Sequence, residues 1–171
     1  LKALRKALYG QILSATAKRT GERVVLKKLL RECVERKLVV SDLRKAGGRR
    51  PQPMLEDARR ELEVLSRLNC DGGHRSVVRL IEGFETANDL VLVMEQLHSD
   101  LFDVVMDGGR LHESSAQKDF LDAVGGLHFI HSHDIAHRDL SLENLLLGSD
   151  GRVVITDFGL CCDCAAGEMQ L

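Results

Sequence analysis

The clearest pattern in the chain is an amphipathic repeat that begins near residue 55. Apolar residues recur there at intervals of three or four positions, with glutamate and arginine filling most places between them. This spacing puts the apolar side chains on one face of a helix. The apolar positions are Leu55, Ala58, Leu62, Leu65 and Leu68. We therefore expect a helix from about Leu55 to Leu68.

A second helical repeat follows later in the chain. Its apolar positions are Ala116, Phe120, Val124 and Leu127, and charged residues occupy the other face. The period of about 3.6 residues again predicts an amphipathic helix, which we expect from about Ser115 to His131.

Short runs of β-branched and other apolar residues predict strands between these helices. The expected strands are Val24–Leu26, Val77–Ile81, Leu90–Met94, Leu145–Leu147 and Val153–Ile155. A turn at 87–89 should join the second and third of these as an antiparallel pair. The loop at 148–151 carries hairpin-forming residues and should join the last two.

Two further stretches divide the chain. Residues 28–53 are basic and contain glycine and proline breakers, which predicts an irregular surface insertion. After Leu97 the pattern changes from strands to helices, so we expect a boundary between two parts of the chain there.

Composition excludes several classes of protein. With 44% hydrophobic residues, 29% charged residues and a net charge of -2, the chain is globular and not a polybasic nucleic-acid binder. Its apolar runs are far shorter than the roughly 20 residues of a membrane-spanning helix. The five cysteines do not have the spacing of a secreted disulfide framework, so we expect an intracellular protein, cytoplasmic or nuclear. The oligomeric state stays open.

The most informative motifs lie on either side of the expected second hairpin. Residues 137–144 read H-R-D-L-S-L-E-N, and residues 157–159 read D-F-G. In order and spacing they resemble the catalytic loop and metal motif of the eukaryotic protein kinase family. The resemblance is to the serine/threonine branch, and loosely to calmodulin-dependent and AMP-activated kinases.

The resemblance implies roles for the residues of these motifs. Asp139 would accept or orient the proton of the substrate hydroxyl, and Arg138 belongs to the same catalytic loop. Asn144 and Asp157 would hold Mg²⁺ against the phosphates of ATP.

The first half of the chain carries a second part of the resemblance. Val24-Val25-Leu26-Lys27 is similar to the V-A-I-K strand of the family, so Lys27 would anchor the phosphates. Glu61 would be its partner on the following helix, and it should point inward because it lies beside the apolar stripe.

The resemblance also implies an adenine site. Met94 would gate the back of the pocket, the backbone of Glu95 and Leu97 would bind the base, and Asp100 would reach the ribose. The remaining nucleotide-binding positions implied are Gly10 in the phosphate loop and Ile12, Val25 and Leu146 around the ring.

The fold implied is the α+β, two-lobed fold of protein kinases. Residues 1–97 would form a small lobe with an antiparallel sheet of about five strands, and residues 98–171 part of a helical large lobe. We expect the chain to be a fragment truncated after the D-F-G motif and inactive by itself. Its full-length parent would transfer the γ-phosphoryl group of ATP to a protein serine or threonine.

Three departures from the family pattern leave an alternative open. Arg5 and Ala7 stand where the first two glycines of G-x-G-x-x-G are expected, and Ser141 replaces the usual lysine of the catalytic loop. Glycine lets backbone N–H groups approach phosphates closely, so these changes weaken the expected grip on ATP. The alternative is a pseudokinase that serves as a nucleotide-binding or scaffold module.

Overall fold

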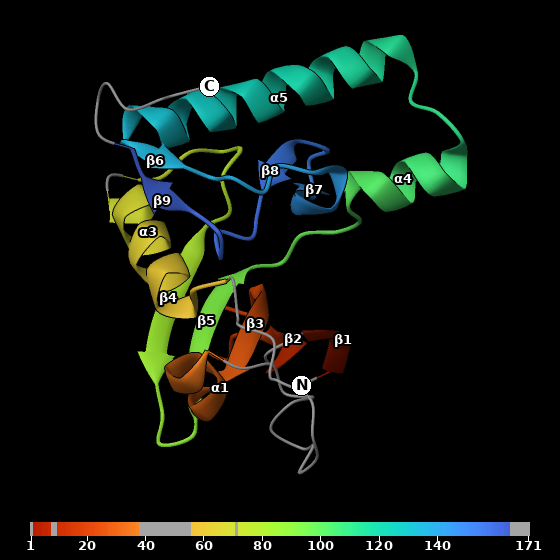
Figure 1. The fold of residues 1–171 in the computed structure, drawn as a ribbon. Coiled ribbons are helices and arrows are strands. Elements are labelled where there is room, and N and C mark those ends of the chain that lie inside the picture. Colours follow the sequence, from red (N-terminus) through yellow and green to blue (C-terminus); the bar gives the residue numbers. More distant parts are fainter. Residues whose placement is uncertain (1, 8–9, 38–55, 71, 165–171) are drawn as a thin grey trace, which may run out of the picture. The chain divides into compact units, whose positions relative to one another are not determined.

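The structure is a computed structural model that describes residues 2–7, 10–37, 56–70 and 72–164. The chain forms two compact units (Figure 1). The first consists of Leu1–Glu63 and Leu80–Gln96, and the second of Val64–Arg79 and Leu97–Leu171. Helix α3 (Ala58–Cys70) therefore contributes residues to both units.

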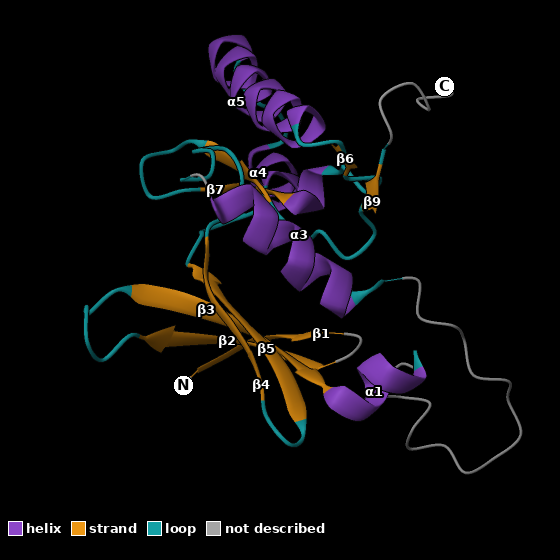
Figure 2. Ribbon diagram, turned by 90° about the vertical axis from the view of Figure 1, so that its left-hand side faces the viewer, coloured by secondary structure: helices purple, strands orange, loops and turns teal. Residues whose placement is uncertain are grey.

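A five-stranded antiparallel sheet dominates the first unit, and its strands are orange in Figure 2. The strand order is β1-β2-β3-β5-β4. The strands are β1 (Lys2–Ala7), β2 (Gly10–Thr16), β3 (Arg23–Leu30), β4 (Leu80–Glu85) and β5 (Asp89–Glu95). The expected α+β architecture with about five antiparallel strands is confirmed.

Strand β4 corrects the prediction of a strand at Val77–Ile81. Val77 forms an isolated bridge with Ile155, and the N–H of Val78 donates to the carbonyl of Ile155 at 3.0 Å, so both belong to the second unit. The strand of the first unit starts only at Leu80 and runs to Glu85. Apolar character alone cannot tell which partner an apolar run will pair with.

The prediction of an irregular insertion at residues 28–53 is also wrong for its first residues. Lys28 to Leu30 complete β3, and α1 (Arg31–Arg36) follows directly. Ion pairs Arg31–Glu35 and Glu32–Arg36, both at i,i+4 spacing, support this short helix, whose Cys33 and Val34 side chains are buried. Residues 38–53 of the predicted insertion lie outside the described residues.

The two amphipathic helices lie close to their predicted positions. α3 begins at Ala58, and α5 spans Glu113–Ser132. The N-terminus of α3 is set by Asp57, whose Oδ1 accepts hydrogen bonds from the N–H groups of Arg59 and Arg60, each at 3.1 Å. Residue 55, where the helix was expected to start, lies outside the described residues.

The second unit is built from helices and short strands. Its further elements are α4 (Leu101–Gly108), β6 (Ile135–Ala136), the 3-10 turn η1 (Leu142–Asn144), β7 (Leu145–Leu147), β8 (Val153–Ile155) and β9 (Cys162–Asp163). β7 pairs with β8, as predicted, and β6 pairs with β9. Helix α5 lies against β8, where Ile130 and Ile155 are fully buried. No helix in the described part of the chain has the length and apolar character needed to cross a membrane.

Helix α4 was not expected from the sequence. It is capped by Asp100, whose Oδ1 accepts a hydrogen bond from the N–H of Asp103 at 2.7 Å. Only Leu101 is buried in this helix. With so few buried positions the apolar stripe is short, which is why periodicity did not indicate the helix.

Candidate active site

The register of the sheet gathers several predicted site residues on one face. Directly opposed residues of antiparallel strands place their side chains on the same face. Ile12 is opposite Lys27, and Val25 is opposite Met94. Val25 and Lys27 are two residues apart on β3 and also share a face. The first unit thus aligns four predicted nucleotide-binding residues on three adjacent strands.

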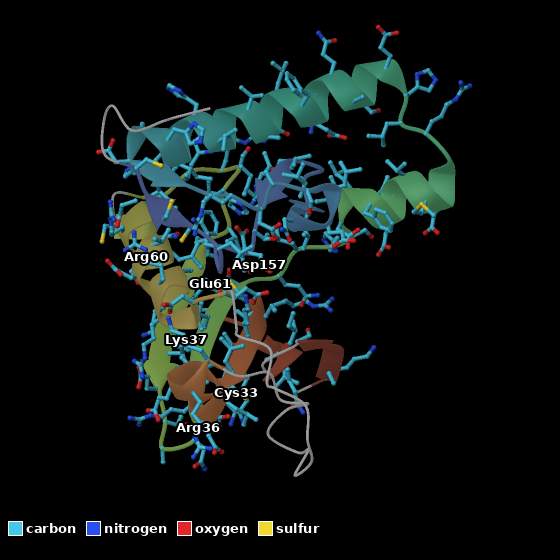
Figure 3. All side chains as sticks on the ribbon, in the orientation of Figure 1. Cys33, Arg36, Lys37, Arg60, Glu61 and Asp157 are labelled. Carbon is cyan, nitrogen blue, oxygen red and sulfur yellow. The ribbon has the colours of Figure 1, made fainter. Side chains whose placement is uncertain are left out.

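Lys27 and Glu61 form a buried ion pair on this face. The Lys27 Nζ donates to both carboxylate oxygens of Glu61, at 2.9 and 2.8 Å. Only 10% of the lysine side chain and 2% of the glutamate side chain are exposed. The prediction that Glu61 points inward is confirmed, and Figure 3 labels Glu61 on α3.

Helix α3 brings Glu61 to Lys27 because of how it starts. Asp57 caps the helix, and its backbone carbonyl accepts from the N–H of Glu61 at 2.8 Å. Glu61 therefore sits in the first turn, on the side where Ala58 and Leu65 are buried. The sequence places a carboxylate on the buried stripe at one position, and a lysine on the facing strand neutralises it.

Gly10 has a structural requirement of its own. A Cβ atom built there would lie 1.9 Å from the Lys28 carbonyl oxygen, which belongs to the neighbouring strand β3. Close approach of two strands accounts for this glycine without any phosphate. Arg5 and Ala7 lie in β1, where they pair with Ile12 and Gly10.

In the second unit the catalytic-loop motif forms a connected set of hydrogen bonds. The Asn144 Nδ2 donates to the backbone carbonyl of Asp139 at 2.7 Å and to its Oδ2 at 2.9 Å. The Asn144 carbonyl accepts from the N–H of Thr156 at 2.9 Å. These bonds join the exposed carboxylate of Asp139 to the segment that leads into Asp157.

The buried His137 ring supports the loop that carries Asp139. His137 is 2% exposed, and its ring meets the ring of Phe158 edge to face with centroids 4.8 Å apart. The backbone N–H of Asp139 donates to the His137 Nδ1 at 3.3 Å, so Nδ1 is unprotonated and the ring proton is on Nε2. The His137 Nε2–H donates to the Thr156 carbonyl at 2.9 Å. Burial lowers the pKa of His137, which keeps the ring neutral in this arrangement.

Two motif residues have left-handed backbone conformations. Arg138 has φ 64° and Asp157 has φ 62°, values that non-glycine residues rarely adopt. Such conformations cost about 1–3 kcal/mol each and persist where surrounding contacts hold them. The Arg138 Nε donates to the Leu160 carbonyl at 2.7 Å, which ties the catalytic loop to the segment after the D-F-G motif. Asp157, labelled in Figure 3, directly precedes the fully buried Phe158.

Two other predicted nucleotide-binding residues meet in the second unit. Asp100 and Leu146 form an antiparallel bridge, which is extended by hydrogen bonds from His98 N–H to the Leu147 carbonyl and from Leu147 N–H to the Ser99 carbonyl. Asp100 is 7% exposed and caps α4. The carboxylate expected to reach a ribose therefore also has a structural partner.

Leu97 and Glu95 lie on either side of the boundary between the two units. Glu95 ends β5 opposite Val24, and Leu97 is the first residue of the second unit's main segment. Ser141, at the position of the missing lysine, is exposed and precedes η1.

The fit to magnesium rests on ligand chemistry. Magnesium prefers hard oxygen ligands and is usually held by one or two protein groups together with substrate phosphates. Asp157 offers a carboxylate, and Asn144 offers the amide oxygen that remains once its nitrogen has bonded to Asp139. Among the described residues, no cluster of three or more His, Cys, Asp or Glu side chains could hold a metal ion by itself. The two residues fit a metal that is held jointly with a nucleotide.

Sequence reasoning missed three residues that matter to the site. The Thr156 carbonyl accepts from His137, and its backbone N–H and hydroxyl group donate to the Asn144 carbonyl; the backbone bonds leave no signal in the sequence. Arg67 and Asp163 form an ion pair across 96 positions of the chain. Neither has a local signal, because both are ordinary charged residues on exposed surfaces.

Comparison with known proteins shows the family of the chain. The family model described as the protein kinase domain matches residues 6–170, and the chain therefore belongs to the protein kinase family. It is 35% identical over 161 residues to NUAK family SNF1-like kinase 2 of Rattus norvegicus. The aligned residues make up 94% of this chain and 22% of that protein.

Two further relatives are serine/threonine kinases or related enzymes by name. The sucrose non-fermenting protein kinase 1 of Fusarium virguliforme is 32% identical, over 94% of this chain and 20% of that protein. The CBL-interacting serine/threonine-protein kinase 26 of Arabidopsis thaliana is 33% identical, over 93% of this chain and 32% of that protein. The chain thus spans about a fifth to a third of the length of these relatives.

Proposed function

We propose that the protein containing this chain is a serine/threonine kinase that transfers the γ-phosphoryl group of ATP to a hydroxyl group of a protein substrate. The observation that carries the proposal is the hydrogen bond between the Asn144 amide and the Asp139 carboxylate. It joins the residue proposed as the base to a residue proposed as a metal ligand.

Asp139 is the proposed catalytic residue. Its carboxylate is exposed, and the bond from Asn144 occupies one oxygen, Oδ2. A carboxylate in this position can accept or orient the proton of a serine or threonine hydroxyl group. Arg138 acts as a positioning residue, since its side chain bonds to the Leu160 carbonyl.

Lys27 is the proposed phosphate anchor, and Glu61 holds its ammonium group in place. Ile12, Val25 and Met94 share the face of the sheet with Lys27, which supports a nucleotide site on that face. Gly10, Glu95, Leu97, Asp100 and Leu146 complete the proposed nucleotide-binding set. Mg²⁺, held by Asn144, Asp157 and the nucleotide, would neutralise charge on the phosphates.

We also propose that residues 1–97 and 98–171 form two lobes, a division that differs from the two compact units in the placement of Val64–Arg79 and Leu97. The five cysteines are free thiols, which supports an intracellular, reducing compartment, cytoplasmic or nuclear.

A second candidate function is a pseudokinase that binds partners without catalysis. It is favoured by Ser141 and by the packing that accounts for Gly10. If Gly10 is needed for the β2–β3 contact, its presence says little about phosphate binding. The two candidates predict different behaviour in a transfer assay.

The test is radiolabelled phosphate transfer by the full-length protein to a generic basic protein, compared with Asp139→Asn and Asp157→Asn. Asp139→Asn should lower kcat by at least about 100-fold, within the range of a lost general base, and leave ATP affinity nearly unchanged. Asp157→Asn should instead remove most of the magnesium dependence of nucleotide affinity, measured by calorimetry with and without metal.

Ser149→Ala, in the turn between β7 and β8, is the matched control and should behave as wild type. An inactive wild-type protein that still binds ATP would move the assignment to the pseudokinase. An unchanged magnesium response in Asp157→Asn would remove Asp157 from the metal role.

A further inference from the structure

Arg67, in the second half of α3, makes two contacts with distant parts of the second unit. Its Nη1 donates to the Asp163 Oδ1 at 2.8 Å, and its Nη2 donates to the His133 carbonyl at 3.1 Å. One guanidinium group thus bonds to a side chain in β9 and to the backbone just before β6. Arginine can do this because its planar fork presents several donors in fixed directions.

The ribbon formed by β6 and β9 is short, and its β6 strand also packs on α5, with Ile135 buried. Each strand has two residues, in the register Ile135 to Asp163 and Ala136 to Cys162. One further backbone bond, from the Cys164 N–H to the Asp134 carbonyl at 2.8 Å, lies beyond the paired strands. Two-stranded ribbons are marginal without added support. Arg67 supplies a contact to each chain segment of this ribbon.

The ribbon lies at the base of both loops of the proposed active site. β6 leads directly into His137 and Asp139, and β9 follows Asp157 and Phe158. The Cys161 N–H bonds to the Phe158 carbonyl at 3.2 Å, so little free chain separates β9 from the D-F-G motif. A shift of β9 would therefore be transmitted to Asp157.

We propose that Arg67 is a positioning residue that clasps the β6–β9 ribbon to α3 and so couples the helix that carries Glu61 to the segment that carries Asp157. Its catalytic consequence rests on the proposed kinase function, whereas its effect on the ribbon does not. The segment that follows the D-F-G motif is thereby held by a helix whose other end pairs with Lys27.

The expected effect is modest. The Arg67 side chain is 43% exposed and that of Asp163 is 56% exposed, so water and salt screen the pair. Exposed pairs of this kind change equilibria by about fivefold or less. The equilibrium concerned is that between the paired and the locally opened β6–β9 ribbon, and hydrogen exchange can measure a change of that size.

The first experiment is native-state hydrogen exchange of the full-length protein at low salt. Arg67→Ala and Asp163→Ala should each speed exchange of the Cys164 amide by about two- to fivefold, and the double variant should add little. Arg59→Ala is the matched control, because it removes the ion pair with Glu85 from the same helix without touching the ribbon. Equal exchange at Cys164 in Arg67→Ala and Arg59→Ala would overturn the proposal.

The second experiment measures kinetics. Arg67→Ala should lower kcat by about two- to fivefold and raise the KM for magnesium-bound ATP, because a shift of β9 would move Asp157, the proposed metal ligand. Arg67→Lys should recover only part of kcat, since an ammonium group is a single point charge. Arg67→Asp combined with Asp163→Arg should be more active than either single variant.

The results separate the two proposals. Wild-type kcat in Arg67→Ala, or a charge swap no better than the single variants, would overturn the coupling. A wild-type protein without transferase activity would defeat the proposed function, while the exchange result would still decide whether Arg67 clasps the ribbon.

Discussion

The two units hold their functional side chains in different ways. In the first unit Lys27 stands on a strand paired on both sides, and its charge is neutralised by a buried carboxylate. In the second unit Asp139 lies on an exposed loop that is held by hydrogen bonds from Asn144 and by the ring of His137.

The two units differ in whether a substitution at the site changes the stability of the unit or only its chemistry. A buried ion pair costs a large desolvation free energy, so removal of one partner affects the whole unit. An exposed loop carboxylate keeps water as an alternative partner, and its removal affects chemistry more than folding. The first unit therefore joins stability to function, and the second keeps them more separate.

The largest expected effect comes from breaking the buried pair. Lys27→Met removes the ammonium partner of a carboxylate that is 2% exposed, and should lower the free energy of unfolding by about 3–5 kcal/mol. Urea unfolding measures this change. The double variant Lys27→Met with Glu61→Leu should recover most of the stability but no ATP binding.

Asp139→Asn is the counterpart in the second unit. It should change the free energy of unfolding by only about 0.5 kcal/mol, because Asn retains an oxygen for the bond from Asn144. A similar loss of stability in Lys27→Met and Asp139→Asn would contradict the comparison.

An intermediate effect is expected from glycines at close contacts. At Gly126, in α5, a Cβ would lie 2.6 Å from the Ser76 carbonyl oxygen, so Gly126→Ala should destabilise by about 1–3 kcal/mol. At Gly125 the nearest atom to a Cβ is in the His74 ring at 3.7 Å, an ordinary contact. Gly125→Ala should therefore stabilise α5 by about 0.5–1 kcal/mol.

Thermal unfolding of the two variants provides the measurement, and each variant is the control for the other. Gly10→Ala extends the comparison to the first unit, where a Cβ would meet the Lys28 carbonyl at 1.9 Å. Equal melting temperatures for the variants at 125 and 126 would contradict the prediction that close packing against Ser76 makes Gly126→Ala destabilising.

The smallest expected effect is a pH dependence caused by His137. Burial lowers its pKa below the ordinary value of 6.5, so below that pH the unfolded chain binds a proton that the folded chain resists. The contribution to stability is fully present above pH 6.5 and is lost as the pH falls through the folded pKa. Urea midpoints measured from about pH 7.5 to 5.5 should fall less steeply in His137→Gln than in wild type. Parallel curves would rule out His137 as a source of the pH dependence.

Much of this protein is determined by the sequence itself. Periodicity located α3 and α5, and short apolar runs located β5, β7 and β8, because apolar side chains must face a core whatever packs against them. The inward position of Glu61 followed from the same stripe. The resemblance of the 137–144 and 157–159 motifs to protein kinases identified the family that the comparison then showed.

The tertiary structure alone decided the rest. Whether Val77 and Val78 pair with Leu90–Met94 or with Ile155 depends on which backbone groups come within hydrogen-bonding distance, and that information is not local. The same holds for the bonds of Arg67 to Asp163 and His133 and for the backbone contacts of Thr156. Hydrophobic patterns specify which face a residue turns inward, whereas hydrogen bonds between distant segments depend on geometry that exists only after the chain has folded.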